Sequence, residues 1–307
     1  MIDGTPGESG AIPPPHAARE SRLLLGGSGG RAVAVALVSS IIVFGLLGWV
    51  AVNAPGWDQV QRQFFDGENF ARSAPGIIAK FEVNVRLFLI AEALILVFGL
   101  VLAVLRGLPS PVFYPIRLIA TVWVDLFRAL PGVLVIYVFG FGIPGLRIPG
   151  VPNDPFFWGV VALTLVYSSY VSEVYRAGIE SVHPSQAAAA RSLGLSQSQA
   201  LRFVVLPQAV RRVIPPLLND FIGLQKDTVL VSFIGVVEIF RQSQIRSSAS
   251  FDFTPYMVTA LVFLVVTIPL ARVTDWLVAR ERDKRYAGAV RAAGARSRRG
   301  RLWTGRR

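Results

Sequence analysis

Long apolar runs separated by short polar segments dominate the chain and predict a bundle of membrane-spanning helices. A helix needs about 20 mainly apolar residues to cross the hydrocarbon core of a bilayer, and runs of about that length recur six times. The fold class we expect is therefore all-α, a polytopic helical membrane protein with six transmembrane helices. The predicted spans are residues 32–52, 87–105, 112–143, 156–175, 214–240 and 255–278.

The third of these runs is too long for one simple span and contains Asp125, Arg128 and Pro131. We expect an inner segment over 112–127 and its continuation over 130–141 after a proline kink. Asp125 and Arg128 are about one helical turn apart, so a second interpretation is that they only pair with each other on a helix surface.

The remaining residues divide the chain into four parts. Residues 1–31, rich in Gly, Pro, Ser and Arg, predict a disordered cytoplasmic tail. Residues 32–80 hold an extra N-terminal span, which is followed by a polar external loop over 53–80. Residues 81–279 hold the other five spans, and 280–307 form a basic tail.

Composition and charge support a membrane protein rather than a nucleic-acid-binding one. The chain of 307 residues is 53% hydrophobic and 16% charged, whereas soluble domains carry about 25% charged residues. The net charge of +12 lies mostly in residues 280–307, where eleven Lys or Arg face two acidic residues. Such a tail beside a span suits an anionic cytoplasmic leaflet. The positive-inside rule places both termini and the segment 177–207 in the cytoplasm.

Several kinds of chemistry are absent from the sequence. The chain has no cysteine and only two histidines, so we expect no disulfide and no metal cluster. None of its three lysines follows a glycine, and there is no G-x-x-x-x-G-K-[ST] motif to hold a nucleotide. No H-E-x-x-H motif or nucleophile elbow occurs. We therefore expect no cofactor and no catalytic residues in this chain.

Charged residues inside the predicted spans require partners or a polar environment. Glu92 either lies near the outer interface or faces a polar pathway inside the bundle. Lys226 lies about 18 Å along a helix that begins at Ile214, so Lys226 and Asp227 would be near mid-bilayer, paired with each other or facing a polar cavity. Glu173 and Arg176, three residues apart, are expected to pair where the fourth span ends.

A polar helix–turn–helix is predicted between the fourth and fifth spans. Pro184 suits the first turn of a helix, and Gly194 can adopt the left-handed conformation that ends one. Ser196 and Gln199 have the S-x-x-Q spacing of a capping box, and we expect Pro207 to interrupt the second helix. Two spans do not need such an element only to be joined, so we interpret it as a surface for a partner.

The same segment resembles the signature loop of the membrane subunits of ATP-binding-cassette importers. That loop reads E-A-A-x-x-x-G, followed after nine residues by I-x-L-P. Here residues 188–190, Gly194 and residues 204–207 fall at that spacing. Ala188 replaces the glutamate, which removes one polar anchor, and Val204 replaces the isoleucine.

Further runs resemble motifs of the polar amino-acid permeases of this family, the histidine, glutamine and glutamate type. The similarity extends over about residues 81–277 and leaves out the first predicted span and both tails. The runs that carry it are residues 126–131, 170–179, 206–209, 215–219 and 224–230.

The resemblance implies a five-span permease core with an additional N-terminal span in the bacterial plasma membrane. Two permease subunits, this chain with itself or with a sister chain, would form the pathway by alternating access. An ATPase dimer would drive them, and an extracytoplasmic solute-binding protein would deliver an amino acid. The residues implied for ATPase coupling are Ser185, Gln186, Ala188, Ala189, Ala190, Arg191, Gly194, Leu206 and Pro207. Our candidates for the substrate path or gate are Glu92, Asp125, Arg128, Tyr170, Asn219, Lys226 and Thr228.

The alternative hypothesis is a self-sufficient ion-coupled carrier or channel that uses Glu92, Lys226 and Asp227 without an ATPase. The helix–turn–helix favours the importer, because a channel has no need of a surface for a motor. An amphipathic helix lying on the lipid surface is a second reading of that segment, but its alanine-rich face is poorly hydrophobic.

Overall fold

The computed structural model describes residues 29–304, with side chains described over residues 30–280. Every regular element over these residues is helical, which confirms the all-α expectation. The chain divides between Arg62 and Gln63 into two units. The first unit contains α2 (Gly29–Val52), whose described side chains are all exposed. The prediction for residues 1–31 lies almost entirely outside the described residues.

Within the described residues, four helical stretches are long and apolar enough to cross a membrane. They lie over Gly30–Val52, Trp57–Arg106, Pro155–Glu180 and Thr254–Arg280. A broken pair of helices, described below, makes a fifth if it counts as one span. The structure thus supports four or five spans, and the predicted number of six is not confirmed.

The segment 53–80, expected to be a polar loop, is mostly helical. It contains α3 (Trp57–Phe64) and the first part of α4 (Gly67–Arg106). The Asp66 carboxylate begins α4 by accepting hydrogen bonds from the backbone N–H groups of two first-turn residues, an N-cap that the apolar pattern does not show. The prediction of a loop was wrong because polar residues here lie on a helix surface, as in the exposed Glu68–Arg72 pair.

The break expected at Pro131 is present and is sharper than a kink. α5 (Tyr114–Ala129) ends before Leu130, which has the extended conformation that a following proline favours. The chain then bends by 105° into a second helical stretch, which makes up the broken pair with α5. That stretch contains α6 (Gly132–Tyr137), a π-helical turn (Val138–Gly142) and α7 (Ile143–Gly145).

The apolar run 214–240, expected as one span, is not one helix. α11 (Leu206–Asp227) tightens into a 3₁₀ turn (Thr228–Ile234), and Gly235 then adopts a left-handed conformation with φ of 93°. α12 (Ile239–Ser250) begins again, with the Glu238 carboxylate accepting from two backbone N–H groups of its first turn. A capping residue inside an apolar run is therefore what divides it.

A buried polar cluster joins α4 to the segment between α11 and α12. The Asn84 amide donates to Glu238 Oε2 at 2.9 Å and to Thr228 Oγ1 at 3.1 Å, and its oxygen accepts from the Ile239 N–H. All three polar side chains are at most 2% exposed. The cluster fixes the position at which α11 ends and α12 begins.

Replacing Asn84 with alanine should therefore destabilise the fold. The change leaves the buried Ile239 N–H without its acceptor and Glu238 without one donor, and each such loss costs about 1–3 kcal/mol. Thermal unfolding in detergent should show a lower midpoint for Asn84→Ala. The matched control is Asn53→Ala, since the Asn53 amide only donates to the exposed Trp49 carbonyl. Equal midpoints for the two variants would contradict the prediction.

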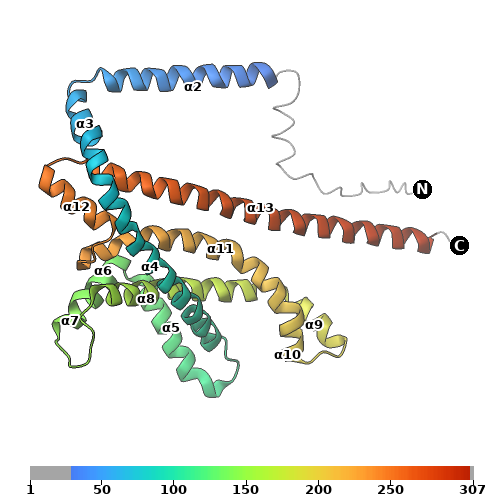
Figure 1. Ribbon diagram of the computed structural model, residues 1–307. Coiled ribbons are helices and arrows are strands. Elements are labelled where there is room, and N and C mark those ends of the chain that lie inside the picture. Colours follow the sequence, from blue (N-terminus) through green and yellow to red (C-terminus); the bar gives the residue numbers. More distant parts are fainter. Residues whose placement is uncertain (1–28, 305–307) are drawn as a thin grey trace, which may run out of the picture. The chain divides into compact units, whose positions relative to one another are not determined.

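The core of the second unit lies where α4 packs along α8 (Pro155–Glu180), with α5 and α11 against the same helix. Close approach depends on small residues, because a Cβ at Gly99 or Gly159 would lie 2.8 Å from a valine methyl group. α9 (Pro184–Ser192) and α10 (Gln197–Ala200) extend from this bundle at the end opposite α7 and α12 (Figure 1). α13 (Thr254–Thr304) continues as a helix beyond the predicted span.

Candidate functional site

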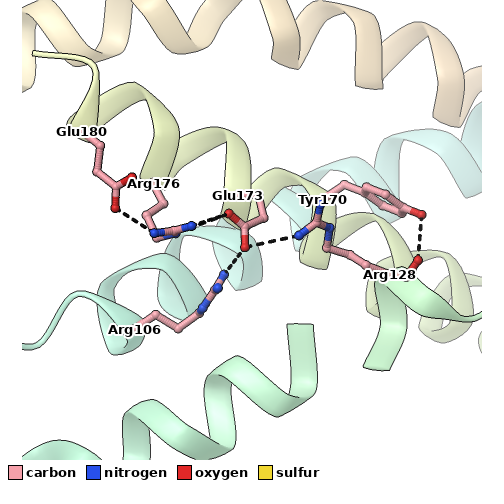
Figure 2. Close-up of polar contacts among 6 residues, drawn as sticks. All are labelled: Arg106, Arg128, Tyr170, Glu173, Arg176 and Glu180. Carbon is pink, nitrogen blue, oxygen red and sulfur yellow. Dashed lines mark hydrogen bonds and ion pairs between the residues drawn. The ribbon is translucent and has the colours of Figure 1, made fainter. Parts of the chain in front are cut away.

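The Glu173 carboxylate contacts three arginines near the end of α8 that leads to α9 (Figure 2). Arg106, the last residue of α4, donates to Glu173 Oε1 at 2.6 Å. Arg176 donates to Glu173 Oε2 from Nε and Nη2, at 3.3 and 3.0 Å, and also to Glu180. Arg128 of α5 lies 3.4 Å from Glu173 Oε1. The predicted pairing of Glu173 with Arg176 is confirmed, and the cluster joins the ends of α4, α5 and α8.

Burial distinguishes the three arginines of this cluster. The Arg106 side chain is only 9% exposed, whereas those of Arg128 and Arg176 are 42% and 40% exposed. Arg106 therefore depends most on Glu173 for neutralisation. The proposed pairing of Asp125 with Arg128 does not form within the described residues: Asp125 is exposed, and Arg128 forms its ion pair with Glu173.

A polar cavity of about 290 Å³ lies farther along the same face of α8. Tyr167 donates its hydroxyl hydrogen to Asp227 Oδ2 at 2.8 Å. Asp220 Oδ2 is buried and has no hydrogen-bond partner among the described residues. None of the lining residues is basic, so the cavity is acidic. They are Gly132, Val166, Tyr167, Tyr170, Asp220 and Asp227.

Tyr170 connects the acidic cavity to the arginine cluster. Its ring lines the cavity, and the Arg128 guanidinium lies 5.9 Å from the ring centroid in a cation–π contact. The Tyr170 hydroxyl donates to the Arg128 carbonyl at 3.4 Å. Tyr167, Tyr170 and Glu173 are spaced by three residues, so they share one face of α8.

The other predicted path residues occupy different surroundings. Glu92 is partly buried and interacts electrostatically with Asp220. Asn219 and Lys226 are exposed, and Asp227 is bound to Tyr167 rather than to Lys226. Thr228, completely buried, belongs to the cluster around Asn84 and not to the cavity.

Several residues of the site were not among the predicted path residues, including Arg176 of the cluster and Asp227 of the cavity. Arg106 and Glu173 form the arginine cluster, and Tyr167 and Asp220 line the cavity. The i, i+3 spacing on α8 is a signal that could have found Tyr167 and Glu173. Nothing in the local sequence shows that Arg106 reaches Glu173, because the two lie 67 positions apart.

The helix–turn–helix forms largely as the sequence predicts. Pro184 lies in the first turn of α9, Gly194 has φ of 91°, and both hydrogen bonds of the capping box between Ser196 and Gln199 are present. The expectation that Pro207 interrupts the second helix was wrong. A π-helical turn (Leu201–Val205) leads directly into α11, whose first turn accommodates the proline.

The residues implied for coupling form a mostly exposed surface. Ala190 is 5% exposed and faces the protein. Leu193, which precedes Gly194, is 83% exposed and is a large apolar side chain presented to the surroundings. The exposed members of the predicted set are Ser185, Gln186, Ala188, Ala189, Arg191, Gly194, Leu206 and Pro207.

Comparison with known families identifies this arrangement. The family described as "Binding-protein-dependent transport system inner membrane component" matches residues 95–283. The chain belongs to this family. The match contains the arginine cluster, the acidic cavity and the helix–turn–helix, and it leaves out α2.

Several relatives are named as permease proteins of ABC transporters or of amino-acid transport systems. The chain is 39% identical over 187 residues to the "Probable glutamine ABC transporter permease protein GlnM" of Bacillus subtilis (strain 168), covering 60% of this chain and 83% of that protein. It is 32% identical to the "Glutamate transport system permease protein GluC" of Corynebacterium glutamicum, covering 66% of this chain and 92% of that one.

Solved structures show the same fold. An amino acid ABC transporter, crystallised with histidines, superposes with a TM-score of 0.64 at 30% identity, covering 70% of this chain and 98% of the matched one. The MetNI methionine ABC transporter, at 14% identity and a TM-score of 0.54, supports the fold alone. The chain is thus an integral membrane permease with the type I importer fold.

Proposed function

We propose that this chain is the membrane subunit of an ATP-driven importer that moves a polar amino acid by alternating access. Its relatives are named as permeases for glutamine, glutamate and arginine, which supports the substrate class. The observation that carries the proposal is the exposed α9–turn–α10 element. It is joined directly to the two helices, α8 and α11, that carry most of the cavity.

The contacts that connect α9 to α8 and α11 are suited to transmit a movement of α9 to these two helices. Val182, Val205 and Ala209 form a small buried cluster against which Ala187 of α9 packs. The Arg212 guanidinium of α11 donates to the Ser181 carbonyl at the end of α8. A displacement of α9 by a partner would therefore move α8 and α11. Because α8 carries Tyr167 and Tyr170 and α11 carries Asp220 and Asp227, the cavity would change shape.

The acidic cavity supports an amino acid as the transported solute. An ammonium group is common to all amino acids, and a carboxylate such as Asp220, buried without a partner, is stabilised by a cation beside it. Tyr167 and Tyr170 add aromatic faces that attract the same kind of group. Glu92, which interacts with Asp220, adds a further acidic group to this region.

The partners follow from the proposed role. The sequence lacks a nucleotide-binding loop, so ATP hydrolysis would reside in a separate ATPase dimer that binds α9. A second permease subunit would complete the pathway, and a solute-binding protein would deliver the amino acid from outside. In this arrangement both termini and α9 lie in the cytoplasm.

The buried carboxylates also favour a second candidate, an ion-coupled carrier that works without an ATPase. Such a carrier would use Asp220 and Glu92 to bind the coupling cation. Uptake by intact cells distinguishes the two functions. Uptake that stops on depletion of ATP and continues after collapse of ion gradients supports the importer, and the reverse supports the carrier.

Gly194→Asp should disconnect the permease from its ATPase. Gly194 has a positive φ, which costs a residue with a side chain about 1–2 kcal/mol, and the new carboxylate would stand beside the exposed Leu193. Affinity capture in mild detergent should recover an ATPase with the unaltered chain and at least about tenfold less with the variant.

Gly150→Asp is the matched control for this experiment. Gly150 also has a positive φ and open space around it, and it lies in the loop between α7 and α8. This control should retain the ATPase. Capture of no ATPase by the unaltered chain would contradict the importer, whereas equal capture by Gly194→Asp would contradict only the docking surface.

A further inference from the structure

We infer that Arg128 binds the carboxylate of the transported amino acid, while the acidic cavity beside it binds the cationic group. The inference rests on the proposed function, since it assigns the specificity of the same site. The opposite charges of the cavity and the arginine cluster, joined through Tyr170, match the two charges of a zwitterion.

Arg128 is the arginine of the cluster that is available for an anion. Both oxygens of Glu173 already accept hydrogen bonds of 2.6–3.0 Å, from Arg106 and Arg176. Arg128 is left with an ion pair of 3.4 Å to the same carboxylate, which is longer than a charge-assisted hydrogen bond. Three guanidinium groups therefore share one partly buried carboxylate, and Arg128 is held least firmly by it.

The position of Arg128 is fixed although its head group is loosely paired. Its guanidinium lies over the Tyr170 ring, and its carbonyl accepts from the Tyr170 hydroxyl. The side chain is 42% exposed, so a solute can reach it. A planar guanidinium positioned in this way can bind a carboxylate through two parallel hydrogen bonds, which a lysine cannot do.

Tyr170 brings the two halves of the site together. The same ring lines the acidic cavity, where Asp220 has an oxygen without a hydrogen-bond partner among the described residues. A solute whose cation occupies the cavity and whose anion contacts Arg128 would span this ring. A plain amine would gain only the cavity, and a plain carboxylate would be repelled by Asp220 and Asp227. The geometry thus selects molecules that carry both charges.

Arg128 has a competing structural role, which is to brace Glu173. If the ion pair between Arg128 and Glu173 were only structural, removing either residue would disturb the cluster in the same way. Arg128→Gln and Glu173→Gln should then have the same effect on ligand preference. A carboxylate-binding role makes the opposite prediction, because Glu173→Gln leaves Arg128 in place and removes its competitor.

The test compares amino acids with the amines that lack only the carboxylate. The full chain in lipid nanodiscs is titrated with L-arginine and agmatine, and with L-glutamine and 4-aminobutanamide. At least one amino acid should bind more tightly than its amine by about tenfold to a hundredfold, as expected for hydrogen bonds to a charged group. Arg128→Gln should remove that ratio by weakening only the amino acid, and Arg128→Lys should restore it in part.

Glu173→Gln should keep or raise the ratio, and Arg86→Gln is the matched control. Among the described residues, Arg86 pairs with Glu82 on an exposed helix face, so the control should leave the ratio unchanged. Binding of neither amino acid, an equal affinity for both members of each pair, or an unchanged ratio in Arg128→Gln would overturn the inference. The importer itself is judged separately by ATPase capture, so either can fail without the other.

Discussion

Replacing Glu173 with alanine is expected to lower the stability of the protein by about 2–4 kcal/mol and to abolish transport. The substitution leaves three guanidinium groups close together, with Arg106 only 9% exposed. Breaking a fully buried ion pair costs about 3–5 kcal/mol. The lower figure applies here because Arg128 and Arg176 are 42% and 40% exposed and solvent screens their charges.

Thermal unfolding in detergent measures this effect, together with uptake in cells that produce the variant. The midpoint should fall by about 5–10 °C. Glu180→Ala is the control, since Glu180 is 61% exposed and, in the part of the chain that the structure describes, pairs with Arg176 alone. It should change stability by less than about 1 kcal/mol. A midpoint for Glu173→Ala equal to that of the control would show that the cluster does not hold α4, α5 and α8 together.

Local signals in the sequence were sufficient to predict the helix–turn–helix. Gly194 and the pair Ser196 and Gln199 act through neighbouring backbone groups, so their spacing alone specifies the turn and the cap. The break before Pro131 was predicted for the same reason, since a proline constrains the residue before it. Its angle of 105° was not, because it depends on packing with distant segments.

The hydropathy pattern gave a wrong helix boundary where a polar side chain forms its hydrogen bonds with a residue distant in the sequence. Glu238 interrupts an apolar run, but its role as the cap of α12 depends on Asn84, which lies 154 positions away. The loop predicted over residues 53–80 has a local cause instead, because the cap at Asp66, which binds backbone groups two and three residues away, was not recognised. Only the error at Glu238 arises because a tertiary contact, rather than local composition, decides where the element begins.

The candidate site shows the same division between local and distant contacts. Tyr170 and Arg128 were predicted separately as path residues, and the structure places one against the other. Asp125 was predicted because it is charged within an apolar run, yet it is exposed. A charged residue within a span therefore requires a polar partner or contact with water. Only the fold shows whether the transport pathway supplies it.

Replacing Gly178 with alanine is expected to force apart the two helices that carry the cavity. A Cβ at Gly178 would overlap with Val213 Cγ2, on α11. Valine in a helix has one strongly preferred rotamer, so its methyl group cannot turn away at little cost. Overpacking of this kind typically costs about 1–3 kcal/mol, against a gain of up to about 1 kcal/mol in helix propensity.

The effect on transport should be larger than the effect on stability. Gly178 lies on α8 between the cavity and α9, and Val213 lies on α11 between the same two features. Separating the helices there would change the path by which a movement of α9 reaches Asp220. Uptake should therefore fall at least about tenfold, even when the chain still folds and retains its ATPase.

Adding the substitution Val213→Ala tests whether a steric clash causes the effect of Gly178→Ala. The double variant Gly178→Ala with Val213→Ala removes the methyl group that causes the clash, so it should recover most of the uptake and of the unfolding midpoint. In a double-mutant cycle, this appears as a favourable coupling between the two positions. Gly142→Ala is the control, since its Cβ would be 4.0 Å from the nearest side chain. Additive effects of the two substitutions would show that contact between Gly178 and Val213 does not set the spacing of α8 and α11.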